Sequence, residues 1–498
     1  MLGYLAQWVD IGFDHPSLVQ RLLGRFSETR RSMLPLGDYV QLRMAEALVA
    51  MAEEDFDRAI QRLEFIPAVE RDLRDQELVA ICNFWIGRCQ RRKGRYDDAL
   101  TYTLKGKNLA LELGFPKMAA VMQVLESWLI FQRGRSDEAA KTLKEAETAL
   151  LETDDYVSRG NIQSAYGRMA RRLGQYDLAL RHFANSIEEY RKRDAQHRNL
   201  ARSLSNMAFV KRLLALRLRK KIDQGAARRG KAGRKAGLPA GGPFQGRLRP
   251  LHERARFERL REEALADLAE AHKIYAALDD HRGAGNVHII HGYIYLDGGD
   301  LDRAAREGEA ARQFGYDKHD ALLAARARIL QCFVENAKFE EQIDEGAGPG
   351  HHAPLAGEWA RDALERAQET QNRRLLAKAQ LALGLTLCND FFNDPENAQR
   401  CCDQAAALLK PEGQDYVWED LQALRSKLLK AGGIDRALRD WSEGRVGDKT
   451  FQQITEEFAG IVIPRVWNRE GRKVSRVAKR LSVSPKKVRR ILAKSGLS

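Results

Sequence analysis

The 498-residue sequence has only six cysteines and contains no stretch of about 18 uncharged apolar residues. No two cysteines form a C-x-x-C pair, so we expect buried, reduced thiols and neither a disulfide framework nor a zinc site. The lack of a long apolar run excludes a transmembrane helix, and the first ten residues lack the cationic start of a signal peptide. The sequence therefore predicts a cytoplasmic protein without a membrane partner.

Motifs of catalysis and cofactor binding are also missing, including G-x-S-x-G and H-E-x-x-H. Residues 225–232 match most of a phosphate-binding P-loop, but no predicted strand precedes them and Ala232 replaces the residue that binds magnesium. His288 and His291 lie one helical turn apart with no third ligand at metal-binding spacing. We therefore expect no enzymatic activity, no cofactor and no metal.

Acidic residues are scarce in two segments, and this asymmetry is more informative than the net charge of +14. Residues 211–250 carry a net charge of +12 and residues 465–498 carry +11, which leaves −9 for the rest of the chain. An acidic body with two basic segments predicts a polyanionic partner for those segments and not for the whole surface.

The body of the sequence repeats a short motif every 40 residues. The motif begins at Glu54, Gly94, Gly134 and Gly174, with an alanine five residues later and a small residue seven residues earlier. The small residues are Ala47, Gly87, Ser127 and Gly167, and the alanines are Ala59, Ala99, Ala139 and Ala179; looser copies contain Gly292, Gly299 and Ala304, and Gly384, Phe391 and Ala398.

This spacing predicts one helical hairpin in each copy. The small residue lets the second helix approach closely, and glycine tolerates the positive φ of a tight turn. One hairpin cannot bury its apolar face alone, so consecutive hairpins must stack into an array.

These positions resemble the tetratricopeptide repeat, a small residue followed by G-x-[FY]-x-x-A, over roughly residues 40–410. The 40-residue period is similar to that of the longer repeats in bacterial regulatory tetratricopeptide proteins. HEAT-like pairs are an alternative with a similar period, but they lack this turn signature. The resemblance implies an all-α superhelix whose concave surface binds a protein or peptide, or which forms a homodimer.

We divide the chain into an N-terminal helical cap at 1–40, a solenoid at 41–442 and a C-terminal unit at 443–498. Within the solenoid, a basic flexible insert is expected at 214–255 and a loop at 342–355. The insert contains few apolar residues over 218–250, so it should be disordered or loosely helical. The second helix of its hairpin should resume near Arg259.

The C-terminal unit shows three short runs of apolar residues at helical spacing. Pro464 should kink the first helix or open the next one at Arg465. Ser482 and Val483 predict a turn, Ser484 is a suitable N-cap, and Pro485 suits the first position of a helix. The runs are Phe451, Ile454, Phe458, Ile461 and Val462, then Val474, Val477, Ala478 and Leu481, then Val488, Ile491 and Leu492.

Cations occupy the remaining positions of the last two helices, as expected for a helix placed in the major groove of DNA. An alternative is a solvated cationic surface on a small helical bundle. We expect base contacts from Ser484, Lys486, Lys487 and Arg490, with Arg489 as a further candidate, and phosphate contacts from Arg472, Lys473, Arg476 and Lys494.

Residues 477–492 resemble the Fis-type helix-turn-helix, whose pattern is similar to A-A-x-x-L-G-I-x-x-x-T-L-x-x-K-L. The chain departs from it at Ser482 (glycine in the pattern), Lys487 (threonine) and Ile491 (lysine). The resemblance implies a DNA-binding domain. We therefore predict a bacterial DNA-binding transcriptional regulator, associated with the nucleoid. The alternative is a non-enzymatic adaptor whose basic segments bind RNA or acidic proteins.

Overall fold

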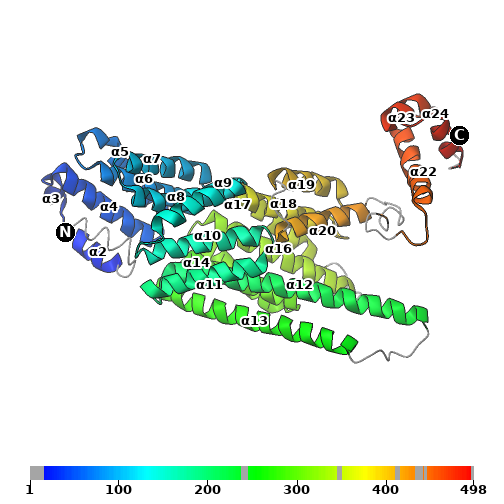
Figure 1. Ribbon diagram of the computed structural model, residues 1–498, viewed down its shortest axis with the longest axis horizontal. Helices are drawn as coiled ribbons and strands as arrows, with labels where there is room; N and C mark the ends of the chain where they lie inside the picture. Colours follow the sequence, from blue (N-terminus) through cyan, green and yellow to red (C-terminus); the bar gives the residue numbers. More distant parts are fainter. Residues whose placement is uncertain are drawn as a thin grey trace. The chain divides into compact units, whose positions relative to one another are not determined.

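The computed structural model describes residues 16–236, 245–344, 350–409, 415–431, 441 and 446–494. Within these ranges the regular structure is entirely helical, so the predicted all-α class is confirmed (Figure 1). None of the described helices is both long enough and apolar enough to cross a membrane. Residue contacts divide the chain into two compact units, Met1–Leu424 and Arg425–Ser498.

The first unit is a stack of helical hairpins. Its first described helices are α2 (Pro16–Leu23) and α3 (Glu28–Ser32), and α2 packs against α4. The hairpins are α4 (Leu36–Ala52) with α5 (Phe56–Ala68), α6 (Gln76–Arg92) with α7 (Tyr96–Glu112), α8 (Pro116–Gln132) with α9 (Ser136–Leu150), α10 (Tyr156–Arg172) with α11 (Tyr176–Arg193), α12 (Arg198–Ala236) with α13 (Gln245–Ala277), α14 (His281–Gly298) with α15 (Leu301–Asp317), α16 (Ala321–Asp344) with α17 (His352–Gln368) and α18 (Arg373–Leu387) with α19 (Pro395–Leu408). The 3-10 helix η1 (Glu70–Asp72) follows α5, and α20 (Tyr416–Ala431) follows α19.

The repeated motif forms the contacts expected of tetratricopeptide-like hairpins. A Cβ atom added to Gly87 would lie 3.0 Å from the carbonyl oxygen of Ala99, so the two helices meet almost backbone to backbone. Gly94 adopts a left-handed φ of 82° at the turn, and Glu54 occupies the same position in the first copy with a φ of 61°. The motif alanines are completely buried at Ala59, Ala99, Ala139, Ala179, Ala304 and Ala398.

Of the two alternatives for the basic insert, disordered or loosely helical, its described residues are helical. It forms the ends of two long helices, because α12 continues to Ala236 and α13 begins at Gln245, well before Arg259. Lys, Arg and Ala favour helices, and the ion pair between Lys220 and Glu419 of α20 (2.8 Å) anchors the extended α12. The P-loop-like residues 225–232 lie inside α12, and residues 237–244 lie outside the described ranges.

The expected loop at 342–355 is shorter in the structure. Helix α16 continues to Asp344 and α17 begins at His352, while residues 345–349 lie outside the described ranges. The six cysteines form no disulfide, and five of them are buried, with Cys388 half-buried.

In the second unit, the described residues from Phe451 onward form three helices, α22 (Phe451–Arg469), α23 (Val474–Leu481) and α24 (Pro485–Lys494). They enclose a small core to which α22 contributes only its second half. Partly buried Val466 and Trp467 pack against this core. The buried residues are Ala459, Ile463, Val477, Ala478, Val488, Ile491 and Leu492.

Helix α22 differs from the sequence prediction in two respects. Its predicted apolar stripe is not the buried face, because Phe451 is 85% exposed and Phe458 is 48% exposed. The short helices α23 and α24 cover only the face formed by Ala459 and Ile463. The helix also runs through Pro464 to Arg469, so no helix opens at Arg465. Apolar contacts on both sides of the proline hold the helix together.

Candidate DNA-binding face and arginine-lined cavity

The turn between α23 and α24 follows the sequence prediction. Ser482 adopts a left-handed conformation with a φ of 52°, at the position where the Fis-type pattern has glycine. The N–H of Val483 donates to the carbonyl oxygen of Ala478 (3.1 Å). The Ser484 hydroxyl accepts a hydrogen bond from the N–H of Lys487 (3.2 Å), so Ser484 is the N-cap of α24 and Pro485 its first residue.

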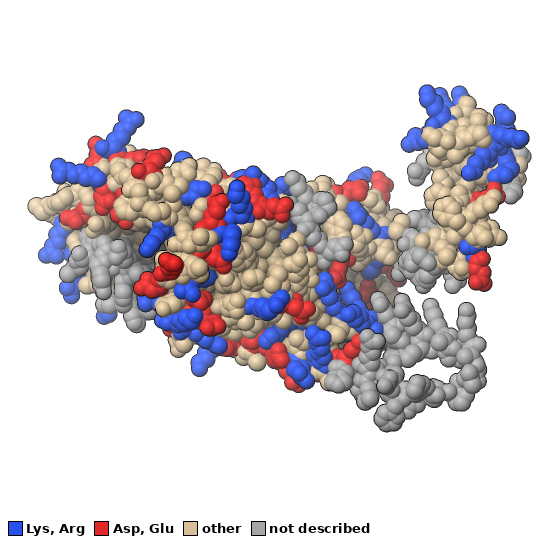
Figure 2. Space-filling view, in the orientation of Figure 1, with Lys and Arg blue, Asp and Glu red and all other residues tan. Residues whose placement is uncertain are grey.

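Most of the predicted DNA-binding residues are exposed on α23, α24 and the turns that precede them. Lys and Arg side chains gather over this end of the unit, whereas Asp and Glu lie mostly toward the beginning of α22 (Figure 2). The side chain of Lys494 lies outside the described set. Ser484, Lys486, Arg489, Arg490, Arg472, Lys473 and Arg476 are exposed, and Lys487 is half-buried.

Two of these cations are already engaged within the unit. Arg490 forms an ion pair with Glu456 of α22 (2.5 Å), which holds its guanidinium beside that helix. Arg472 has a φ of 62° and lies over the ring of Trp467, with its guanidinium 5.5 Å from the ring centroid. Lys486 and Arg489 form no ion pair with any residue that the structure describes. The front of α24 therefore presents these two side chains.

The first unit contains a functional candidate that the charge analysis missed. The first helices of successive hairpins line a cavity of about 370 Å³ on the inner face of the array. Its wall contains ten Lys or Arg side chains but only two Asp side chains, Asp280 and Asp415. This space, which we call the arginine cavity, is cationic although the body of the chain is acidic overall.

Five arginines of this wall, which we call the arginine cluster, have no carboxylate partner within 4.0 Å among the described residues. The two carboxylates of the wall pair with cations outside this cluster. Asp280 pairs with Arg198 (3.0 Å), and Asp415 pairs with Arg374. The cluster consists of Arg91, Arg168, Arg171, Arg202 and Arg326.

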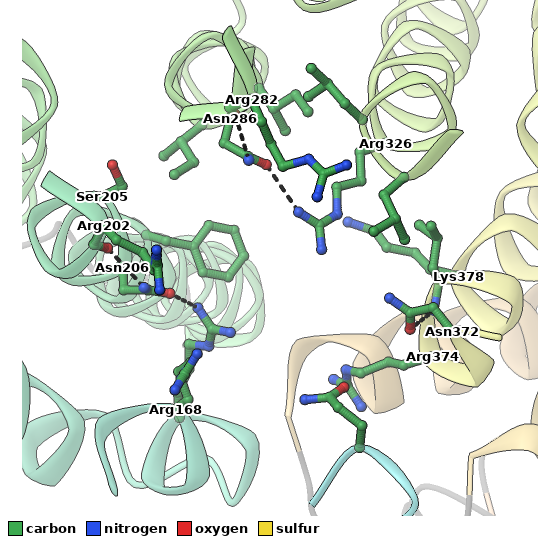
Figure 3. A pocket seen from close by; sticks show the side chains of 18 of the residues that line it. Arg168, Arg202, Ser205, Asn206, Arg282, Asn286, Arg326, Asn372, Arg374 and Lys378 are labelled. Atoms are coloured by element: carbon green, nitrogen blue, oxygen red, sulfur yellow. Dashed lines mark hydrogen bonds between the residues drawn. The ribbon is translucent and has the colours of Figure 1, made fainter. Parts of the chain in front are cut away.

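Asparagine side chains orient two members of the cluster. Arg171 donates to the Oδ1 atom of Asn206 (2.9 Å), and Arg326 donates to the Oδ1 atom of Asn286 (3.0 Å). Each asparagine donates its Nδ2 to the carbonyl oxygen four residues earlier in its own helix (2.8 Å in both cases). Figure 3 shows Arg326 and Arg168 reaching into the cavity from different helices. These guanidinium groups are thus positioned without being neutralised.

Aromatic rings support three members of the cluster. The guanidinium groups of Arg91 and Arg168 lie 5.4 and 5.7 Å from the ring centroid of Trp128. Arg171 lies 5.3 Å from the ring centroid of Phe209. An aromatic face attracts a cation without removing its charge, so these contacts also leave the cavity positive.

The ionisation of buried groups reflects this positive potential. Burial, and then the charge of nearby Arg202, lower the pKa of Arg168 to about 9. Burial alone would raise the pKa of the Tyr416 phenol, but the charges of Lys378, Arg374 and Arg171 outweigh it and lower the pKa to about 8. Burial also lowers the pKa values of Arg91, Arg171 and Arg202. A negative charge beside these buried guanidinium groups is therefore stabilised.

Distant hairpins meet beside the cavity. The N–H of Gln371, between α17 and α18, donates to the carbonyl oxygen of Gly94 (3.0 Å). The N–H of Asp97 donates in turn to the Gln371 side chain (2.8 Å). Asn372 donates to the hydroxyl of Tyr96 (3.0 Å). The array thus coils until the turn before α18 contacts the turn before α7.

A sequence signal for the cavity does exist. Arginine follows the small motif residue at one, four and five positions in two copies that are 80 residues apart. These positions lie on the first helix of each hairpin, which faces inward. The residues are Arg88, Arg91 and Arg92 after Gly87, and Arg168, Arg171 and Arg172 after Gly167.

The histidine pair lies outside the cavity. The Nδ1 atom of His288 lies 2.7 Å from Glu307, and that of His291 lies 3.8 Å from the same carboxylate. Across the described parts of the chain, no group of three or more His, Cys, Asp or Glu side chains is placed to hold a metal ion.

No protein-family model and no curated protein matches the chain. Similar solved structures include the human IFIT1 dimer with m7Gppp-AAAA, with 14% identity, a TM-score of 0.42 and coverage of 99% of this chain and 100% of that chain. NprR in complex with its cognate peptide NprX gives 10% identity, a TM-score of 0.41 and coverage of 92% and 99%. A signal transduction ATPase with a tetratricopeptide repeat sensor, from Pyrococcus horikoshii, has 15% identity and a TM-score of 0.40. The match covers 82% of this chain and 54% of that chain. Likenesses this distant assign neither a family nor a ligand.

Proposed function

We propose that this protein is a bacterial DNA-binding transcriptional regulator that acts in the cytoplasm, on the nucleoid. Its second unit binds DNA as a Fis-type helix-turn-helix, and its repeat array binds a protein or peptide partner. The start of α24 carries this proposal. The Ser484 cap fixes the first turn, so Lys486 and Arg489 are exposed while Val488 is fully buried. The first residues of a recognition helix are those that reach base edges.

The test is DNA occupancy by the intact protein across the genome, followed by binding to the recovered site. Replacing Lys486 and Arg489 by alanine should reduce the preference for that site over a random duplex by at least about tenfold, because a base contact contributes about 1–3 kcal/mol. Arg303→Ala, which removes an exposed cation of α15, is the control and should change nothing. Undiminished binding of the site by a chain lacking residues 451–498 would sink the proposal.

A homodimer is part of this proposal. One helix-turn-helix reads few base pairs, and two half-sites call for two copies. The exposed Phe451 and Phe458 on α22 provide an apolar face for a second copy. Phe458→Glu should therefore yield monomers in light scattering at a concentration where the parent protein is dimeric. An unchanged mass would show that α22 is not the interface.

The alternative is an adaptor that binds RNA or acidic proteins through its basic segments. The observation in its favour is the net charge of +12 over residues 211–250, most of which lie in the extended ends of α12 and α13. A gel-shift comparison of duplex DNA with structured RNA at two salt concentrations separates the two functions. A preference for RNA that requires residues 211–250 would favour the adaptor.

A further inference from the structure

The arginine cluster concentrates like charges in a confined space. Burying charges without counter-ions costs free energy, and a fold normally pairs them or removes them. In this array, the two carboxylates of the wall are bound to other cations, Arg198 and Arg374. The cluster therefore has the composition of a site whose counter-ion is a ligand.

The cavity is poorly equipped to bind a peptide backbone. Peptide amides need free side-chain amides that donate and accept at once, but the three asparagines of the wall are engaged, which leaves Gln132 as its one remaining side-chain amide among the described residues. Asn206 and Asn286 hold the arginines and their own helices. Asn372 caps α18 through the N–H of Leu375 (3.0 Å) and donates to Tyr96. The amides of Asn206 and Asn286 thus position guanidinium groups, and the amide of Asn372 joins two distant hairpins.

Size and charge density favour a small multivalent anion. A volume of about 370 Å³ lies within the range of small-molecule sites. One peptide residue brings at most one side-chain charge, whereas one phosphate group brings about 1.5 to 2 negative charges. A molecule with consecutive phosphate groups therefore matches five arginines in this volume better than an acidic peptide does.

We propose that the arginine cavity binds a small molecule that carries two or more linked phosphate groups. The planar guanidinium fork matches phosphate oxygens with two parallel hydrogen bonds. Arg171 and Arg326 are oriented for this by Asn206 and Asn286, and they approach from helices α10 and α16. This proposal goes beyond the DNA-binding function and does not rest on it, because it concerns the first unit alone.

The experiment is calorimetric titration of the full chain with inorganic tripolyphosphate and, separately, with ATP. Arg171→Gln and Arg326→Gln should each weaken tripolyphosphate binding by about tenfold or more, the effect of losing a hydrogen bond between charged groups. Arg303→Gln on α15 is the matched control, because it removes one arginine outside the cavity. The Arg303→Gln variant should bind tripolyphosphate with the same affinity as the parent protein.

Thermal melting separates a binding role from a structural one. If the cluster exists for a ligand, Arg171→Gln and Arg326→Gln melt at or above the temperature of the parent without ligand, because repulsion is relieved. Tripolyphosphate should raise the melting temperature of the parent by more than that of the variants. A lower melting temperature of both variants together with unchanged binding would overturn the proposal.

Competition distinguishes the sources of the anion. Equal affinity for tripolyphosphate and ATP supports recognition of the phosphate chain alone, and tighter binding of ATP supports a phosphorylated organic ligand. Failure of both to bind at millimolar concentration, or their displacement by hexaglutamate or a single-stranded RNA at lower concentration, would overturn the proposal. Loss of DNA binding with tripolyphosphate binding intact would count only against the DNA-binding function.

Discussion

Asn372 donates a hydrogen bond of 3.0 Å to the hydroxyl of Tyr96, which lies 276 positions earlier in the chain. Both side chains are buried. The hydrogen bond joins the beginnings of α18 and α7, next to the backbone hydrogen bond from Gln371 to Gly94. One coil of the array is closed at this point, and both side chains line the arginine cavity.

Tyr96→Phe should loosen this closure. The substitution leaves the buried amide of Asn372 without its acceptor, which costs about 1–3 kcal/mol. Hydrogen exchange measured by mass spectrometry should rise at 94–97 and 370–372 and stay unchanged in α14. Tyr102→Phe, also on α7, is the control, because Tyr102 is only half-buried. Equal exchange in the two variants would show that the hydroxyl does not hold the closure.

Gly87→Ala should destabilise the array. The added Cβ atom would lie 2.6 Å from the Thr103 hydroxyl and 3.0 Å from the Ala99 carbonyl oxygen. Because the backbone of α7 must move away, we expect a loss of about 1–3 kcal/mol and a lower melting temperature by circular dichroism. Gly37→Ala in α4 meets nothing within 4 Å and should gain about 0.4–1 kcal/mol. Identical melting of the two variants would contradict the close-contact role of Gly87.

Features of this fold that depend on residues close together in the sequence were predictable from their spacing. Gly87, Gly94 and Ala99 act within one hairpin, so their spacing was sufficient to predict it. Ser484 and Pro485 act within one helical turn, and their prediction was confirmed for the same reason.

Features that depend on distant partners were missed. Phe458 has helical spacing with its neighbours, but which face of α22 is buried depends on the short reach of α23 and α24. The extension of α12 gains its ion pair from Glu419, 199 positions after Lys220. The cavity needs the meeting of Tyr96 and Asn372. Counting charges along the chain could not show that arginines from separate repeats converge there.

Tyr416 should ionise far below an ordinary tyrosine. Lys378, Arg374 and Arg171 overcome the effect of burial and opposing Asp420, and they lower its pKa to about 8. An ordinary tyrosine titrates near pH 10. The tyrosinate absorbance near 295 nm should therefore show a step close to pH 8 that Tyr416→Phe removes.

The same titration has two linked consequences. Because the folded-state pKa is below the unfolded value, ionisation of Tyr416 favours the folded state as the pH rises from about 8 to about 10. It also adds a negative charge to the cavity, so tripolyphosphate affinity should fall over this range in the parent and fall less in Tyr416→Phe. Equal affinity for tripolyphosphate at pH 7 and pH 9.5 would contradict both the lowered pKa of Tyr416 and the expected decrease in affinity.

Glu456→Gln should strengthen DNA binding by releasing Arg490. The two side chains form an ion pair of 2.5 Å, and both are partly exposed. Because such pairs are worth about 0.2–1 kcal/mol, its loss should raise affinity for duplex DNA by up to about fivefold in fluorescence anisotropy. Glu457→Gln makes the same charge change at the adjacent residue, whose ion-pair partner is Lys449 (2.6 Å). It should increase the affinity for DNA less than Glu456→Gln does. In an Arg490→Ala background the difference between the two glutamine variants should vanish. If it persists there, Arg490 does not contact the DNA, and general charge repulsion explains the gain.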